Sequence, residues 1–122
     1  MKKKPLKLLI ALLLLSASTV GAFIYYQKKS EENERWNKMT HEERMAAIFA
    51  REMKKAESGD ADAQLYLGSH YFWGFPSNET EGVKWYRKAA EQGQARAQGM
   101  VGYAYLEGKG VDRDPQQGIN WY

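Results

Sequence analysis

An internal repeat of about 34 residues constrains this chain more than any other feature of its sequence. Residues 59–74 and residues 93–108 align at an offset of 34, with seven identical positions where average composition gives about one. The identical pairs are Gly59/Gly93, Ala61/Ala95, Ala63/Ala97, Gln64/Gln98, Gly68/Gly102, Tyr71/Tyr105 and Gly74/Gly108. The match resumes at an offset of 36, with the pairs Gly82/Gly118, Trp85/Trp121 and Tyr86/Tyr122. Each copy is therefore one structural unit that stacks on its neighbour.

Capping residues and glycines divide each copy into two helices. Asp60, Asn78 and Asp114 each stand where a helix N-cap is expected, and glycines follow the predicted helix ends. The predicted helices cover residues 61–72, 79–92 and 95–107, with a fourth that starts at Pro115. The sequence thus predicts an all-α body, a short α/α superhelix of helical hairpins.

Small residues indicate how closely these helices approach each other. Ala63, Leu67 and Tyr71 recur at helical spacing on one face, and Gly68 lies beside them. Glycine inside a helix costs about 1 kcal/mol relative to alanine, so its presence calls for a packing reason. We expect the partner helix to pass directly over Gly68.

The repeat resembles the Sel-one-like repeat, a class similar to the tetratricopeptide repeat. The resemblance rests on three motifs over residues 56–122: G-D-A-x-A-Q-x-x-L-G-x-x-Y-x-x-G, then W-Y-R-K-A-A-E-Q-G, and G-K-G-V-x-x-D. It implies an α/α superhelix and a role in protein–protein interaction. The family also includes cysteine-rich members credited with binding or hydrolysing cell-wall compounds. Those members use a disulfide in each repeat, and this chain has no cysteine, which weakens any transfer of their activity.

The predicted repeat domain covers residues 41–122 and is short at both ends. Residues 41–58 form a capping helix with an apolar stripe, in the place of a preceding second helix. Repeat 1 covers residues 59–92. Repeat 2 covers residues 93–122 and is truncated, because it stops where the first copy continues with RKAAEQG.

The N-terminus is predicted to be a signal peptide or a transmembrane anchor over residues 1–29, followed by a juxtamembrane linker over residues 30–40. Residues 8–26 carry no charge and as a helix would span about 28 Å, close to the hydrocarbon core of a bilayer. Cleavage after Ala22 is the alternative to an uncleaved anchor. The lysines that precede the apolar run predict a cytoplasmic N-terminus. The expected location is the bacterial inner membrane, single-pass with the C-terminal domain in the periplasm, or the periplasm itself after cleavage.

Charge and residue inventory exclude several functions. Residues 1–29 contain six lysines and no acidic residue, whereas residues 30–122 contain 12 Lys and Arg and 15 Asp and Glu. A nucleic-acid module needs its basic residues on the folded body, so nucleic acid is not an expected partner. With no cysteine and only His41 and His70, we expect no metal, no cofactor and no catalytic residues, and hence no enzyme.

Partner binding is predicted on the first helix of each hairpin. At repeat positions outside the packing set, the spacing places Asp62, Tyr66, Ser69 and Trp73 on one stripe, and Arg96, Met100, Tyr103 and Glu107 on its counterpart. Tyr66, Trp73, Met100 and Tyr103 are the candidate contact residues, because aromatic side chains and methionine are favoured at interfaces. The alternative is that these side chains make ordinary contacts between repeats.

Two classes of function follow. The chain is expected to be an envelope-facing scaffold or adaptor that binds a protein partner, or an inhibitor or immunity factor of that kind. The competing class is a periplasmic hydrolase of cell-wall or β-lactam compounds. The sequence offers that class no nucleophile next to a base.

Overall fold

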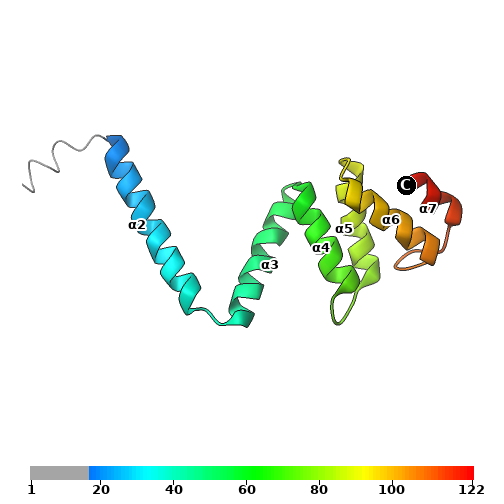
Figure 1. The fold of residues 1–122 in the computed structure, drawn as a ribbon, viewed down its shortest axis with the longest axis horizontal. Helices are drawn as coiled ribbons and strands as arrows, with labels where there is room; N and C mark the ends of the chain where they lie inside the picture. Colours follow the sequence, from blue (N-terminus) through cyan, green and yellow to red (C-terminus); the bar gives the residue numbers. More distant parts are fainter. Residues whose placement is uncertain (1–16) are drawn as a thin grey trace, which may run out of the picture. The chain divides into compact units, whose positions relative to one another are not determined.

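The computed structural model describes residues 17–122, and all regular elements in this range are helices. They are α2 (Ala17–Lys38), α3 (His41–Glu57), α4 (Ala61–Trp73), α5 (Glu79–Glu91), α6 (Ala95–Glu107) and α7 (Pro115–Trp121), labelled in Figure 1. The all-α prediction is confirmed. The chain divides into two compact units, one ending at Arg44 and one covering Met45–Tyr122, which are described in turn.

The described part of the first unit consists of α2 and the turn that follows it. A capping box starts α3, since the Thr40 backbone N–H donates to Glu43 Oε2 at 2.7 Å and the Glu43 N–H donates to Thr40 Oγ1 at 3.2 Å. Arg44 fastens the turn by donating to the carbonyls of Trp36 and Asn37, both at 3.1 Å. The predicted linker is therefore helical up to Lys38.

Much of the predicted targeting segment, residues 1–16, lies outside the described residues. Along residues 17–122, no helix combines the length and the apolar content that a membrane crossing requires. The apolar side chains at the start of α2 are all exposed, and they belong to Val20, Phe23, Ile24, Tyr25 and Tyr26.

The second unit contains the repeats, and its helix starts are those that the sequence indicates. Asp60, Asn78 and Asp114 each accept a hydrogen bond from the backbone N–H three residues ahead, at 2.8–3.1 Å. Gln94 caps α6 in the same way, a role that the sequence did not reveal because glutamine is a rare cap. Each cap satisfies N–H groups that the first turn of a helix leaves free.

Two glycine contacts recur in each repeat and set how closely the helices pack. A Cβ atom on Gly68 would lie 2.7 Å from Cε1 of Tyr86, and one on Gly102 would lie 3.0 Å from Cε2 of Tyr122. In the same way, Gly82 faces Phe72, and its counterpart Gly118 faces the side chain of Leu106. The close approach expected at Gly68 is confirmed. These two contacts explain why the repeat keeps glycine at positions 68/102 and 82/118.

A glutamine links each hairpin to the helix before it. Gln64 is buried and its Nε2 donates to the Ala56 carbonyl at 3.1 Å, while Gln98 Nε2 donates to the Ala90 carbonyl at 3.2 Å. Gln64 Oε1 also accepts from Gln92 Nε2 at 2.8 Å. Because a buried amide without partners is costly, these bonds fix the register of one hairpin against the next.

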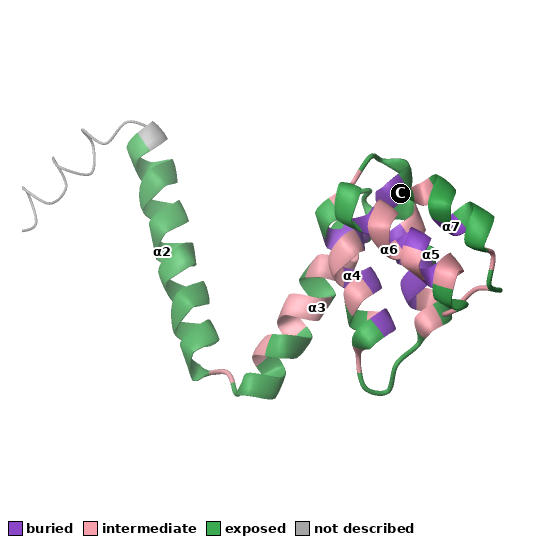
Figure 2. Cartoon of the chain, turned by 45° about the vertical axis from the view of Figure 1, so that its right-hand side comes forward, coloured by how far each residue is buried: buried purple, intermediate pink, exposed green. Residues whose placement is uncertain are grey.

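The core consists of two neighbouring clusters, seen as the buried residues of α4, α5 and α6 in Figure 2. The larger cluster joins α4, α5 and α6 around Tyr86, Phe72 and Val101. The smaller one joins Leu67 of α4 to the end of α3, where Ala56 is buried. The C-terminal half of α3 thus packs on repeat 1 through this cluster.

Candidate functional site

A groove with a volume of about 760 Å³ lies between the first helices of the two hairpins, α4 and α6. Its lining residues are Leu65, Ser69 and Trp73 from α4, Tyr86 from α5, Arg96, Gly99, Met100 and Tyr103 from α6, and Tyr122. Three of the four predicted contact residues therefore come together here, and they do so from two different repeats. Helical spacing puts them on one face of each helix, and repeat stacking sets the two faces side by side.

Aromatic rings form one end of this groove. Trp73 is 58% exposed although it is large and apolar, and its ring centroid lies 6.1 Å from that of Tyr103. Lys109, from the loop after α6, places its Nζ atom 5.5 Å from the centroids of both rings. An ammonium group at this distance is attracted to the negative faces of the rings. The two rings and the lysine are thus held together as one surface.

The floor of the groove is polar but internally paired. The Tyr86 hydroxyl donates to Ser69 Oγ at 3.1 Å, and Ser69 Oγ donates to the Leu65 carbonyl at 3.0 Å. Burial raises the pKa of Tyr86, an effect that the Ser69 hydrogen bond and the Arg96 guanidinium partly oppose. Both hydroxyl donors of the floor are therefore already used inside the protein.

Tyr66, the fourth predicted contact residue, does not line the groove. It packs on the smaller core cluster beside α3, and its ring stacks on His70 with centroids 6.4 Å apart. His70 in turn lies 4.6 Å from the ring of Phe49. Tyr66 therefore makes an ordinary contact between neighbouring elements, which was the alternative to partner binding. Its counterpart in the second repeat, Met100, lines the groove, whereas α3 packs beside Tyr66.

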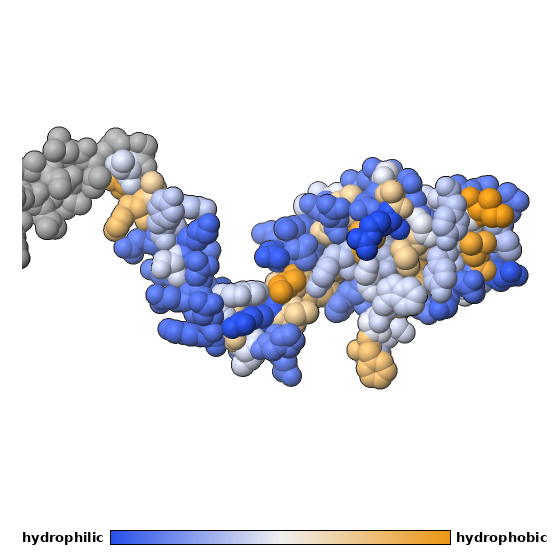
Figure 3. Space-filling model, viewed as in Figure 1, coloured by the Kyte–Doolittle hydropathy of each residue, from blue (hydrophilic) through white to orange (hydrophobic). Residues whose placement is uncertain are grey.

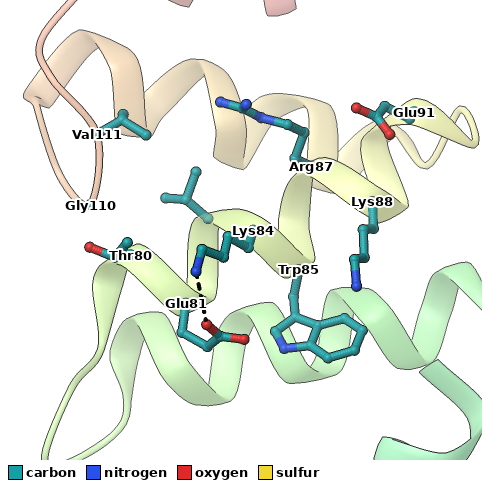
Figure 4. Close-up of a pocket in the computed structure, with 10 residues that line it drawn as sticks. Thr80, Glu81, Lys84, Trp85, Arg87, Lys88, Glu91, Gly110 and Val111 are labelled. Atoms are coloured by element: carbon teal, nitrogen blue, oxygen red, sulfur yellow. Dashed lines mark ion pairs between the residues drawn. The ribbon is translucent and has the colours of Figure 1, made fainter. Parts of the chain in front are cut away.

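A second hollow, of about 410 Å³, lies along α5 beside the loop that follows α6 (Figure 4). Two of its lysines make contacts within the hollow, one in an ion pair and one over an aromatic ring. Lys84 pairs with Glu81 at 3.6 Å, and Lys88 Nζ lies 4.2 Å from the Trp85 ring centroid. Arg87 points away from these groups toward α6, where it donates to the Tyr105 hydroxyl, and its Nε is buried without a hydrogen-bond partner. This hollow is smaller than the groove, and its lining holds acidic as well as basic side chains.

The last helix leaves apolar side chains at the surface. In Figure 3 orange atoms gather at the end of the repeat domain that α7 forms. Ile119 is 61% exposed and Tyr122 is 73% exposed, whereas Trp121 packs against the larger core cluster. Little therefore covers Ile119 and Tyr122 at this end, whereas Trp121 is partly covered.

Three residues that matter here were not assigned a role from the sequence. Phe72 is a central core residue, and its equivalence to Leu106 could have revealed it as an apolar position in both copies. Gln64 is identical in both copies, but only the structure shows its hydrogen bonds. Lys109 lies in the loop whose length differs between the copies, so the repeat could not place it. Within residues 17–122, no group of three potential ligands could hold a metal ion.

Comparison with known proteins agrees with this architecture. A sequence profile that describes the Sel1 repeat matches residues 61–94 and 95–122. The chain is 38% identical over 73 residues to chitin synthase regulatory factor 3 of Schizosaccharomyces pombe, a match that covers 57% of this chain and 8% of that protein.

Two solved structures are similar as well. The first is a protective antigen of uropathogenic Escherichia coli displaying an SLR fold, with a TM-score of 0.56 and 42% identity, over 61% of this chain and 16% of that one. The second is a Sel1 repeat protein from Oxalobacter formigenes, with a TM-score of 0.57 and 40% identity, over 61% of this chain and 30% of that one. The chain thus spans less than a third of the length of each relative.

Proposed function

The chain belongs to the Sel1 repeat family, and from this premise we propose that it is a binding scaffold that holds a protein partner in the α4–α6 groove. The observation that carries the proposal is the apolar lining of the groove, assembled from two repeats by the exposed Trp73 and the half-buried Met100 and Tyr103. Aromatic side chains in such hollows are the usual anchors of protein interfaces. A relative named as a regulatory factor of an enzyme supports a role exerted through another protein.

We propose binding rather than hydrolysis because of the chemistry of the groove. The hydroxyl groups of its floor, on Ser69 and Tyr86, are bonded within the protein, and its lining holds no histidine, aspartate or glutamate side chain that could act as a base. His70 stacks on Phe49 and Tyr66 instead. An inhibitor or immunity factor would be one form of such a binder.

The setting that we propose is the bacterial inner membrane, with the repeat domain in the periplasm. The support is the uncharged run of residues 8–26 and the lysines that precede it. A C-terminal fusion to alkaline phosphatase, which is active only outside the cytoplasm, should be active. An active fusion to a cytoplasmic reporter would contradict this topology, and the mass of the mature protein would distinguish an anchor from a cleaved signal.

The binding proposal can be tested by photo-crosslinking in cells. A benzophenone side chain at position 100 should crosslink to a partner, and one at Lys84, an exposed residue outside the groove, should not. With the partner identified and purified, Trp73→Ala should weaken binding by about 30-fold, the effect of losing roughly 2 kcal/mol at an interface anchor. Its melting temperature should stay close to that of the wild type, because the side chain is largely exposed.

Two results would contradict the proposal. If Trp73→Ala melts far below the wild type, the ring is part of the core and its effect on binding says nothing about a surface. If affinity is unchanged in Trp73→Ala, Met100→Ala and Tyr103→Ala, the groove is not the site. The fully exposed Phe75, in the loop after α4, would then be the next surface to test.

A further inference from the structure

The charged side chain in the lining of the groove is basic. Arg96 lines it, and Lys109 lies over the Trp73 and Tyr103 rings. No aspartate or glutamate is among the lining residues. Within the described part of the chain neither Arg96 nor Lys109 forms an ion pair. The groove therefore has one cation in its lining and a second, Lys109, outside the lining but over the two rings at one end, and no ion pair within residues 17–122 neutralises either charge.

The nearest acidic residues on the same helix faces do not cancel this charge. Asp62, at the start of α4, accepts a hydrogen bond from Gln94 Nε2 at 3.1 Å and does not line the groove. Glu107, at the end of α6, is exposed and is not part of the lining either. The hollow beside α5 is different, because its three basic residues share that space with Glu81 and Glu91.

This positive charge is local to the groove. Residues 45–122 carry nine Lys and Arg against ten Asp and Glu, so the domain as a whole is not basic. A nucleic acid binds through many phosphate contacts along a basic face, which two cations on a nearly neutral domain do not provide. The complement of such a groove is a short chain segment with a few carboxylates next to an apolar side chain.

We propose that the groove recognises an acidic segment of its protein partner, a refinement that rests on the binding function proposed above. An apolar side chain of the segment lies against Trp73, Met100 and Tyr103. Its flanking carboxylates accept hydrogen bonds from Arg96 at one side and from Lys109 at the other. The carboxylates of the segment bind at the rim of the groove, because both hydroxyl groups of its floor already donate within the protein. The Lys109 ammonium can still donate hydrogen bonds while it lies over the two rings.

The test is a selection of random 12-residue peptides displayed on phage against the full-length chain, followed by affinity measurements on the synthetic peptides. Peptides that require Trp73 should be rich in aspartate and glutamate beside an aromatic residue or leucine. Their affinity should fall about tenfold in Arg96→Glu and in Lys109→Gln, the loss expected for one charge-assisted hydrogen bond. The matched control is Lys84→Glu, which changes an exposed lysine outside the groove and should leave the affinity unchanged.

The affinity should also fall as sodium chloride rises from 50 to 500 mM, because screening shortens the reach of exposed charges. The contributions of the apolar ring and of the charges to the affinity can be measured separately, since Trp73→Ala removes apolar area and leaves Arg96 in place. Binding that responds to both kinds of variant supports the proposal.

Three outcomes would overturn the inference in distinguishable ways. Peptides that depend on Trp73 but carry no excess of acidic residues would leave the binding function intact and refute the acidic partner. If no selected peptide depends on Trp73, Met100 or Tyr103, the proposed function fails together with the inference. Phosphatidylglycerol vesicles or a single-stranded oligonucleotide that bind with the same dependence on Arg96 and Lys109, and none on Trp73, would show a general anion surface instead.

Discussion

Replacing Gly68 with alanine should destabilise the repeat domain through a single contact. The new Cβ would lie closest to Cδ1 of Tyr86, with Cε1 at 2.7 Å and Cγ at 2.9 Å, so the ring must move by roughly 1 Å to reach an ordinary 3.4 Å contact. Tyr86 is fully buried, which leaves the ring no open space to enter. Overpacking of this kind costs about 1–3 kcal/mol, and alanine returns at most about 1 kcal/mol through its better helix propensity.

Gly99 provides the matched control for this substitution. It lies inside α6, and a Cβ there would meet nothing within 4 Å. The gain in helix propensity is common to both variants, so the difference between Gly68→Ala and Gly99→Ala isolates the overpacking, about 1–3 kcal/mol. For a domain of this size the two melting temperatures should differ by roughly 4–8 °C for each kcal/mol, with Gly99→Ala above the wild type and Gly68→Ala at or below it.

Urea and thermal unfolding followed by tryptophan fluorescence give the required free energies, and a double variant tests the cause. Combining Gly68→Ala with Tyr86→Leu removes the ring that the new methyl group meets, so the two changes should be less damaging together than their sum. The reasoning is refuted if Gly68→Ala melts as high as Gly99→Ala. Strict additivity in the double variant would show that the damage does not arise at Tyr86.

Three further predictions concern other elements of the domain. Gln64→Leu should lower the free energy of unfolding by about 1–3 kcal/mol, measured by urea titration, because it removes the donor to the Ala56 carbonyl and one of the two acceptors of Gln92, which keeps only the Gly59 carbonyl. Stability should fall as the pH rises above about 10, since the unfolded chain releases the phenolic proton of Tyr86 before the folded one does, and Tyr86→Phe should remove that part of the pH dependence of melting. Amide hydrogen exchange should be faster across α7 than across α5, because α7 has seven residues and exposed apolar side chains; equal protection would mean that this end is sealed.

The sequence was sufficient to predict the helices of the repeat domain, for reasons that the structure makes physical. Glycine and capping residues act locally, so Asp60 and Asn78 mark helix starts without any knowledge of the fold. The need for glycine at position 68 is a tertiary effect, but the repetition of the residue at position 102 indicated it. Wherever a contact recurs in both copies, comparing the copies provided the evidence that a single stretch of sequence could not.

The candidate site was predicted only in part, because its decisive contacts do not repeat. Tyr66 and Met100 are equivalent positions, yet α3 lies against the first and the groove is formed beside the second. Lys109 reaches the rings from a loop that has no counterpart of equal length in the first copy. Periodicity describes what the repeats share, whereas a binding surface depends on where they differ.

The groove has one further consequence, which follows from its two walls belonging to different repeats. Trp73 belongs to the first hairpin, and Met100 and Tyr103 belong to the second. At an interhelical distance of roughly 10 Å, a rotation of about 5° between hairpins changes the width of the groove by about 1 Å. The width of the groove and the angle between the two hairpins therefore change together. An occupant that binds best at one width should favour one angle between the hairpins, and a change in that angle should alter the affinity for the occupant in return.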